Sequence, residues 1–96
     1  MRSEIQIEQF TENNRYVRSR WISDGHDCWG RGEGYHEYYV LIGTGKERTE
    51  ERVGTDMYII SWGNEVLCVA YNWNLESEIN SALRVIADRR QYKLEL

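Results

Sequence analysis

Hydrophobic and polar residues alternate along the first part of the chain in a way that is typical of β-strands. Residues 4–10 place Ile5 and Ile7 on one face and glutamate or glutamine on the other, which is the two-residue period of a strand with one face in water. Residues 11–14 supply turn chemistry, because asparagine tolerates the left-handed region and bonds to its own backbone. Residues 15–22 are again rich in β-forming types and end at a Ser-Asp-Gly turn signal. We therefore expect two strands that pair with each other as a hairpin.

The middle of the chain contains a strand with two apolar faces, followed by a charged segment. Residues 36–43 carry large apolar or aromatic side chains on both faces, which indicates a strand that is covered on both sides. Residues 43–55 are dominated by charged side chains and have Val53 as their only apolar member. We expect this charged segment to be a solvated loop.

The clearest unit in the sequence is a second hairpin. Residues 56–62 and residues 65–73 are β-rich runs that flank a Gly-Asn pair, and a glycine in the first position suits a two-residue type II′ turn. A loop of this length would place Ile60 opposite Leu67. Both faces of the hairpin are apolar, so we expect it to lie at the centre of the sheet with a helix over one face.

Residues 74–91 have the pattern of an amphipathic helix. Asn74 is a favourable N-cap, and Glu76 and Glu78 fall in the first two turns, where the positive end of the helix dipole favours acidic groups. Apolar residues recur at helical spacing at Leu75, Ile79, Ala82, Leu83 and Ile86. The stripe indicates a helix that packs across one face of the sheet.

These segments together predict an α+β fold in a single domain, residues 1–96. We expect an antiparallel sheet of about five strands in a largely sequential, meander-like order, with the C-terminal helix packed on one face. A chain of 96 residues is long enough to bury a compact core without disulfides or a structural metal.

Charge and the N-terminal segment restrict the function classes. The formal net charge of −4 and the pI near 5.2 disfavour a nucleic-acid binder that relies on a broad basic field, and they fit a partner that is basic. The first residues lack the apolar core of a signal peptide, and no apolar run approaches the roughly 18 residues that a membrane span needs. We expect a cytoplasmic protein with no membrane anchor and no cofactor. Its cysteines should be reduced, although a disulfide between Cys28 and Cys68 stays open, and a homodimer is compatible with the sequence.

The glycine-rich segment 26–36 offers three metal-ligand side chains. His26, Cys28 and His36 lie within it, and Cys68 would complete a set of two cysteines and two histidines. Their spacing matches none of the paired-ligand patterns of known zinc sites, and a thiol on a central strand packs as an ordinary hydrophobe. A metal site at these residues is therefore only a secondary hypothesis.

The same segment lacks the context that phosphate binding or catalysis requires. A phosphate-binding glycine loop needs a strand before it and a helix start after it, whereas here a β-rich run follows. Cys28 beside His26 or His36 would make a thiolate pair, but a single glycine-rich loop gives little preorganisation. We expect no catalytic residues, and we keep a small metal-dependent or cysteine-dependent enzyme as an alternative.

A second alternative is the binding of single-stranded nucleic acid. Tyr16, Arg18 and Arg20 share one face of a predicted strand, and aromatic side chains interleaved with arginine can stack on exposed bases. Acidic residues surround this small patch, and cross-strand ion pairing explains the two arginines equally well.

Recognition of another protein agrees best with the sequence. Residues 23–36 are long for a hairpin connection, and such segments are often functional. Trp29, Arg31, Tyr35 and His36 are of types that are enriched at interface hot spots, and the glycines let the segment adapt. The plainer interpretation is that Trp29 and Tyr35 pack onto the core.

These features predict a small, non-enzymatic protein-binding domain that acts as a stoichiometric inhibitor or an adaptor. Bacterial immunity proteins and phage-encoded inhibitors of host defence are of this general type in size and charge. On this hypothesis the aromatic segment and the acidic residues Glu50 and Glu51 contact a basic protein partner.

Overall fold

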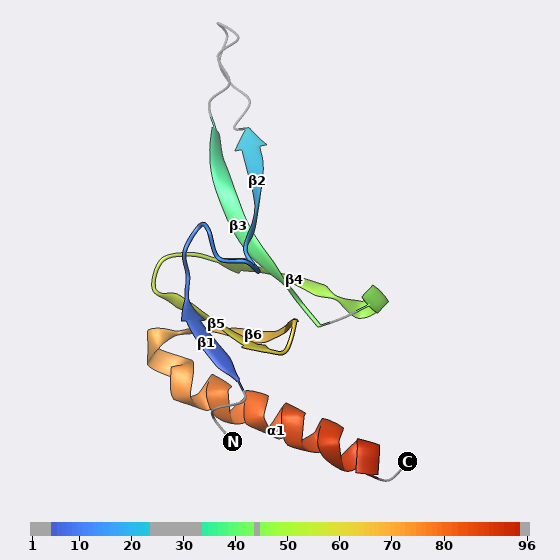
Figure 1. The fold of residues 1–96 in the computed structure, drawn as a ribbon. Coiled ribbons are helices and arrows are strands. Elements are labelled where there is room, and N and C mark those ends of the chain that lie inside the picture. Colours follow the sequence, from blue (N-terminus) through green and yellow to red (C-terminus); the bar gives the residue numbers. More distant parts are fainter. Residues whose placement is uncertain (1–4, 24–33, 44, 95–96) are drawn as a thin grey trace, which may run out of the picture.

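The computed structural model describes residues 5–23, 34–43 and 45–94, and these form an α+β fold (Figure 1). The described strands and helix are β1 (Gln6–Gln9), β2 (Arg18–Ser23), β3 (Gly34–Ile42), β4 (Thr49–Val53), β5 (Met57–Trp62), β6 (Glu65–Tyr71) and α1 (Leu75–Leu94). Two short 3-10 turns, η2 (Gly45–Glu47) and η3 (Asn72–Asn74), precede β4 and α1. Within these residues, no helix combines the length and the apolarity that a membrane crossing requires.

The described sheet is mixed and has six strands, so the expectation of about five antiparallel strands in meander order is only partly correct. Its strand order is β1-β5-β6-β3-β2, and β4 pairs with β3. The contact between β3 and β6 is parallel and joins Ile42 to Val66. The expected hairpin of the first two strands is wrong, because β1 pairs with β5 instead. The reason is long-range burial: a strand at the edge of β5 places Ile5 in the core beneath the helix.

Strand β3 is paired on both of its edges, and the partner on one edge changes along its length. Tyr39 pairs with a residue of β2 and also with a residue of β4, so these two strands lie on opposite edges. Ile42 pairs with β4 and with β6, so those two are also on opposite edges. Strands β2 and β6 therefore follow one another along the same edge of β3.

The charged segment that was expected to be a loop forms strand β4. Val53 anchors the strand in the core at 7% exposure, and the remaining residues are exposed. Charged side chains are tolerated here because β4 lies at the edge of the sheet. Two of them also form ion pairs with the neighbouring strands, as described below.

The predicted β5–β6 hairpin is confirmed, with a change of register. Gly63 adopts a φ of 63°, which is the conformation that the first position of a type II′ turn requires. Ser61 pairs with Val66 as the two-residue loop predicts, but Ile60 pairs with Cys68. Leu67 is thus a bulged residue between two paired positions, and the predicted pairing of Ile60 with Leu67 is wrong.

Two hydrophobic clusters lie on opposite faces of the β5–β6 hairpin. Ile60 and Ala70 face α1 and pack with the helix, while Ile59 and Val66 pack with Val40 of β3. Figure 1 shows the resulting order, in which β1, β5 and β6 lie between the helix and the layer of β2, β3 and β4. The apolar pattern on both faces of this hairpin is explained by the two layers that cover it.

Helix α1 buries the predicted apolar stripe and extends past its expected end. Ile79, Ala82 and Ile86 are at most 3% exposed, and the helix continues to Leu94. Asn74 belongs to η3, where its side chain accepts a hydrogen bond of 2.7 Å from the backbone N–H of Tyr71.

The packing of α1 predicts unequal effects at two adjacent positions. Ile86 is 1% exposed, and Val85 is 40% exposed. We expect Ile86→Ala to lower the free energy of unfolding by about 2–5 kcal/mol, because it leaves a cavity between helix and sheet. Val85→Ala should cost less than about 0.5 kcal/mol. Urea denaturation followed by circular dichroism measures both, and equal losses would contradict the described orientation of the helix.

Candidate functional site

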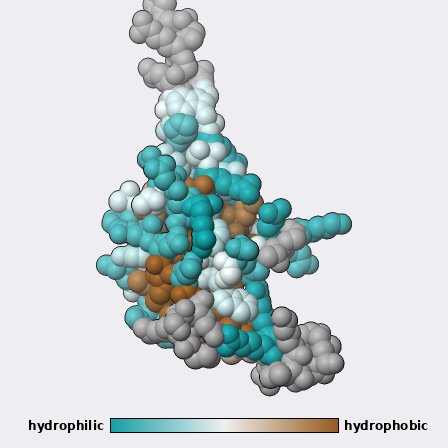
Figure 2. Space-filling view, viewed as in Figure 1, coloured by the Kyte–Doolittle hydropathy of each residue, from teal (hydrophilic) through white to brown (hydrophobic). Residues whose placement is uncertain are grey.

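Strands β2 and β3 extend together away from the body of the molecule and form an arm, residues 18–23 and 34–39 (Figure 1). Strand β4 pairs with β3 only from Tyr38 onward, so the outer part of the arm has two strands among the described residues. Figure 2 shows mainly polar and intermediate surface on the arm, while strongly hydrophobic surface lies on the body. The arm is the most prominent projection of the described chain.

A row of four aromatic rings runs along one face of the arm. Trp21 of β2 lies opposite His36 of β3, and their rings meet edge to face at 5.1 Å between centroids. His36 is 6.2 Å from Tyr38, and Tyr38 makes an edge contact of 5.5 Å with Phe10. Phe10 and Tyr38 pack on the cluster around Val40, so the row connects exposed rings to the core.

The base of this row is held by a polar contact. The Glu12 side chain lies near the Tyr38 hydroxyl, and desolvation, together with this carboxylate, raises the pKa of Tyr38. This carboxylate belongs to the connection between β1 and β2, so the base of the row lies beside that connection.

A glycine on β3 sets the position of the outermost ring. A Cβ at Gly34 would lie 2.2 Å from the carbonyl oxygen of Ile22 and 2.8 Å from a ring carbon of Trp21. The indole therefore lies against β3 between Gly34 and His36. These contacts set the orientation of the Trp21 side chain, although 51% of it is exposed.

The other face of the arm carries paired charges. The Arg20 guanidinium forms an ion pair with Glu50 of β4, across β3, and lies 4.5 Å from the centroid of the Tyr39 ring. Arg52 approaches Glu37 at 3.6 Å. This face is therefore locally balanced in charge, and its exposed ion pairs contribute little stability each.

The predicted partner-binding residues fall into three groups. Tyr35 and His36 are exposed on β3 and point to opposite faces of the arm. Glu50 is paired with Arg20, whereas Glu51 points to the opposite face of β4 and is exposed. Trp29 and Arg31 lie outside the described residues, as do His26 and Cys28 of the alternative metal set.

The residues predicted for nucleic-acid binding do not share one open surface. Tyr16 is half-buried against the cluster around Val40, and its hydroxyl donates a 3.0 Å hydrogen bond to the carbonyl of Gly63. Arg20 is engaged with Glu50, as the alternative of cross-strand pairing anticipated. Arg18 remains exposed at the base of the arm.

Sequence reasoning missed two groups of exposed aromatic side chains. The position of Trp21 in the row of rings depends on its cross-strand neighbours, which a linear pattern does not identify. Tyr71 and Trp73 stack at 6.0 Å with an interplanar angle of 9° where β6 meets the helix, and Trp73 is 82% exposed. The signal available in the sequence was the pair of aromatic residues directly before the helix start.

Cys68 is a free, half-buried thiol on β6, which agrees with its expected place on a central strand. Burial first, and the neighbouring Glu78 second, raise the pKa of the Cys68 thiol from its ordinary value of 9.0 to about 11. In the described part of the chain, no three histidine, cysteine or acidic side chains group closely enough to hold a metal ion.

Comparison with known proteins identifies no relative. No protein-family model matches this chain, and neither a curated protein nor a solved structure matches it.

The raised pKa of Cys68 predicts slow thiol chemistry. In a Cys28→Ser background, we expect the reaction with a disulfide reagent to be slow at pH 8 and to increase with a midpoint near pH 11, because the thiolate is the nucleophile. The folded state holds this proton more tightly than the unfolded chain, so the corresponding stability is present below pH 9.0 and lost as pH rises toward 11. A rate midpoint near the ordinary thiol value would contradict this environment.

The contact between Gly34 and Trp21 predicts that a single methyl group disturbs the arm. We expect Gly34→Ala to destabilise the protein by about 1–3 kcal/mol and to weaken the nuclear Overhauser effects between Trp21 and His36. Gly54→Ala is the matched control, because a Cβ there meets nothing within 4 Å. Unchanged Trp21–His36 contacts in the Gly34 variant would show that the indole does not lie against β3.

Proposed function

We propose that this chain is a small protein-binding domain that acts stoichiometrically, as an inhibitor or an adaptor, and that the arm is its docking element. The observation that carries this proposal is the row of rings from Phe10 to Trp21, which begins in the core and ends on an exposed projection. Aromatic anchors whose orientation is already set lose little conformational entropy on binding, and this favours their use as hot spots.

The pairing pattern of the arm supports the same function. A two-stranded hairpin in water is marginally stable by itself, and edges of a sheet offer unpaired N–H and C=O groups to another chain. Among the described residues, the outer edge of β2 and the edge of β3 before Tyr38 have no strand partner. A partner that pairs with one of these edges and receives Trp21 in an apolar pocket would use both the unpaired backbone groups and the exposed ring.

Charge supports a basic partner. The net charge of −4 raises the encounter rate with a positively charged surface. Glu51 of β4 lies near the arm and is exposed. Its side chain points away from the face that carries the ion pairs of Arg20 and Arg52. The rings would then provide affinity, and acidic groups beside them would provide orientation.

Photo-crosslinking tests the location of this interface. We expect benzoylphenylalanine at position 21 to crosslink, in a lysate of the source organism, to one protein in a one-to-one complex. The same probe at position 73 is the control, because Trp73 is even more exposed and lies at the junction of β6 and α1. Crosslinks from position 73 and none from position 21 would place the interface elsewhere.

Affinity for the crosslinked partner tests the energetic role of Trp21. We expect Trp21→Ala to weaken binding by about thirtyfold, which is the lower limit of a hot-spot effect of about 2 kcal/mol. Trp73→Ala should leave the affinity unchanged, and Glu51→Lys should slow association with a basic partner. Equal affinity of the Trp21 variant and the wild-type protein would refute the assigned role of the arm.

A further inference from the structure

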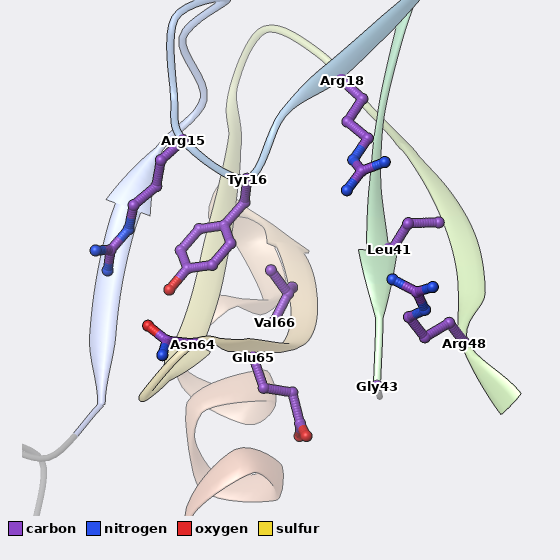
Figure 3. A pocket seen from close by; sticks show the side chains of 9 residues that line it. All are labelled: Arg15, Tyr16, Arg18, Leu41, Gly43, Arg48, Asn64, Glu65 and Val66. Carbon is purple, nitrogen blue, oxygen red and sulfur yellow. The ribbon is translucent and has the colours of Figure 1, made fainter. Parts of the chain in front are cut away.

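A small polar cleft lies at the base of the arm, where one edge of β3 changes from β2 to β6 (Figure 3). Pairing with β2 ends at Tyr39, and pairing with β6 begins at Ile42. The cleft occupies this interval and has a volume of about 140 Å³. It is therefore a direct consequence of the pairing of β3.

Arginines from separate segments of the chain converge on this cleft. Arg18 comes from β2, and Arg48 comes from the segment between η2 and β4. Figure 3 shows their guanidinium groups pointing toward one another on either side of Leu41. Arg15 also lines the cleft, beyond Tyr16, and its guanidinium donates a 2.5 Å hydrogen bond to the side-chain oxygen of Gln6.

The acidic residue that lines the cleft does not form an ion pair with Arg18. The Glu65 carboxylate points away from the arginines toward the helix and lies 2.7 Å from the guanidinium of Arg89 (Figure 3). Arg20, which shares this face of β2 with Arg18, has a carboxylate partner in Glu50 of β4. Among the described residues, Arg18 has no acidic group within 4 Å.

Backbone groups add polar character to the same place. Gly43 donates its N–H across this edge of β3 to the carbonyl of Val66, at 3.2 Å. Successive N–H groups of a strand alternate between its two edges, so that of Leu41 faces the same edge, in the interval between the two paired stretches. The side-chain amide of Asn64 lines the opposite wall.

We propose that this cleft binds a phosphate group, with Arg18 and Arg48 as its principal ligands. Guanidinium groups bind phosphate oxygens through pairs of parallel hydrogen bonds, and a phosphate carries more charge than a carboxylate to share between two arginines. The cleft is smaller than the roughly 300 Å³ at which sites for whole ligands begin, so it fits a single phosphate group. That group is either free phosphate or the monoester of a larger molecule.

Titration of the isotope-labelled full chain tests the site directly. Sodium phosphate, O-phospho-L-serine and sodium acetate are added separately at constant ionic strength, and amide resonances of Leu41, Gly43 and Asn64 are followed. We expect saturable shifts with phosphate and with phosphoserine. Tighter binding of phosphoserine identifies a phosphate ester as the ligand, and equal binding identifies free phosphate. Equal saturation by acetate would overturn the assignment to phosphate.

Charge-matched variants separate a built site from general attraction. We expect Arg18→Gln and Arg48→Gln each to weaken phosphate binding by about tenfold or more, because each removes a charge-assisted contact. Arg84→Gln, which removes one exposed charge from α1, should bind phosphate as the wild-type protein does. The amide spectrum of each variant shows whether it is folded. Absence of saturable shifts, or equal binding by the Arg18 and Arg84 variants, would overturn the proposal, and neither result depends on a protein partner of the arm.

Discussion

The backbone pairing of β3 is the interaction on which the rest of the structure depends. Buried N–H and C=O groups must be paired, and β3 meets this requirement with three different strands. Strand β4 takes one edge, while β2 and β6 divide the other. The parallel bridge to β6 is short, but Val40 and Ile59 on the facing layers are both fully buried. Hydrophobic packing therefore supports a connection that few backbone bonds would hold alone.

The β5–β6 hairpin needs cover on both faces, and two different structures provide it. Helix α1 covers one face with a stripe around Ile79 and Ile86, and the layer of β2, β3 and β4 covers the other through Val40 and Val53. The bulge at Leu67 turns two consecutive side chains, Leu67 and Cys68, toward the cluster beneath the helix. A small domain thus obtains a three-layer arrangement from a single mixed sheet and one helix.

Local signals in the sequence predicted the elements whose causes are local. The helix and the β5–β6 hairpin follow from side-chain periodicity and from a glycine at the turn, and both were found with small errors in boundary or register. Strand β4 was missed because its charges are balanced by Arg20 and Glu37, which belong to distant segments. The pairing of β1 with β5 was missed for the same reason, since no local pattern specifies a distant partner.

The candidate sites were predictable only in part, because a local pattern does not identify distant neighbours. Tyr35 and His36 were predicted from composition alone, whereas Trp21 gains its place only from the cross-strand contact with His36 and the close approach to Gly34. Arg18 was considered together with Arg20 because they share a strand face. The structure separates their environments, since Arg20 faces Glu50 and Arg18 faces the cleft.

The arm and the cleft have one structural origin. Beyond the end of β4, β3 keeps only β2 as a described partner, and the paired strands project from the body. In the interval between β2 and β6, β4 is the only described strand that pairs with β3, and a polar gap opens beside Leu41. Arg18 belongs to both features, because it is the first residue of β2 and it lines the cleft. A ligand held by Arg18 would therefore act on the base of the arm, at the point where the row of rings enters the core.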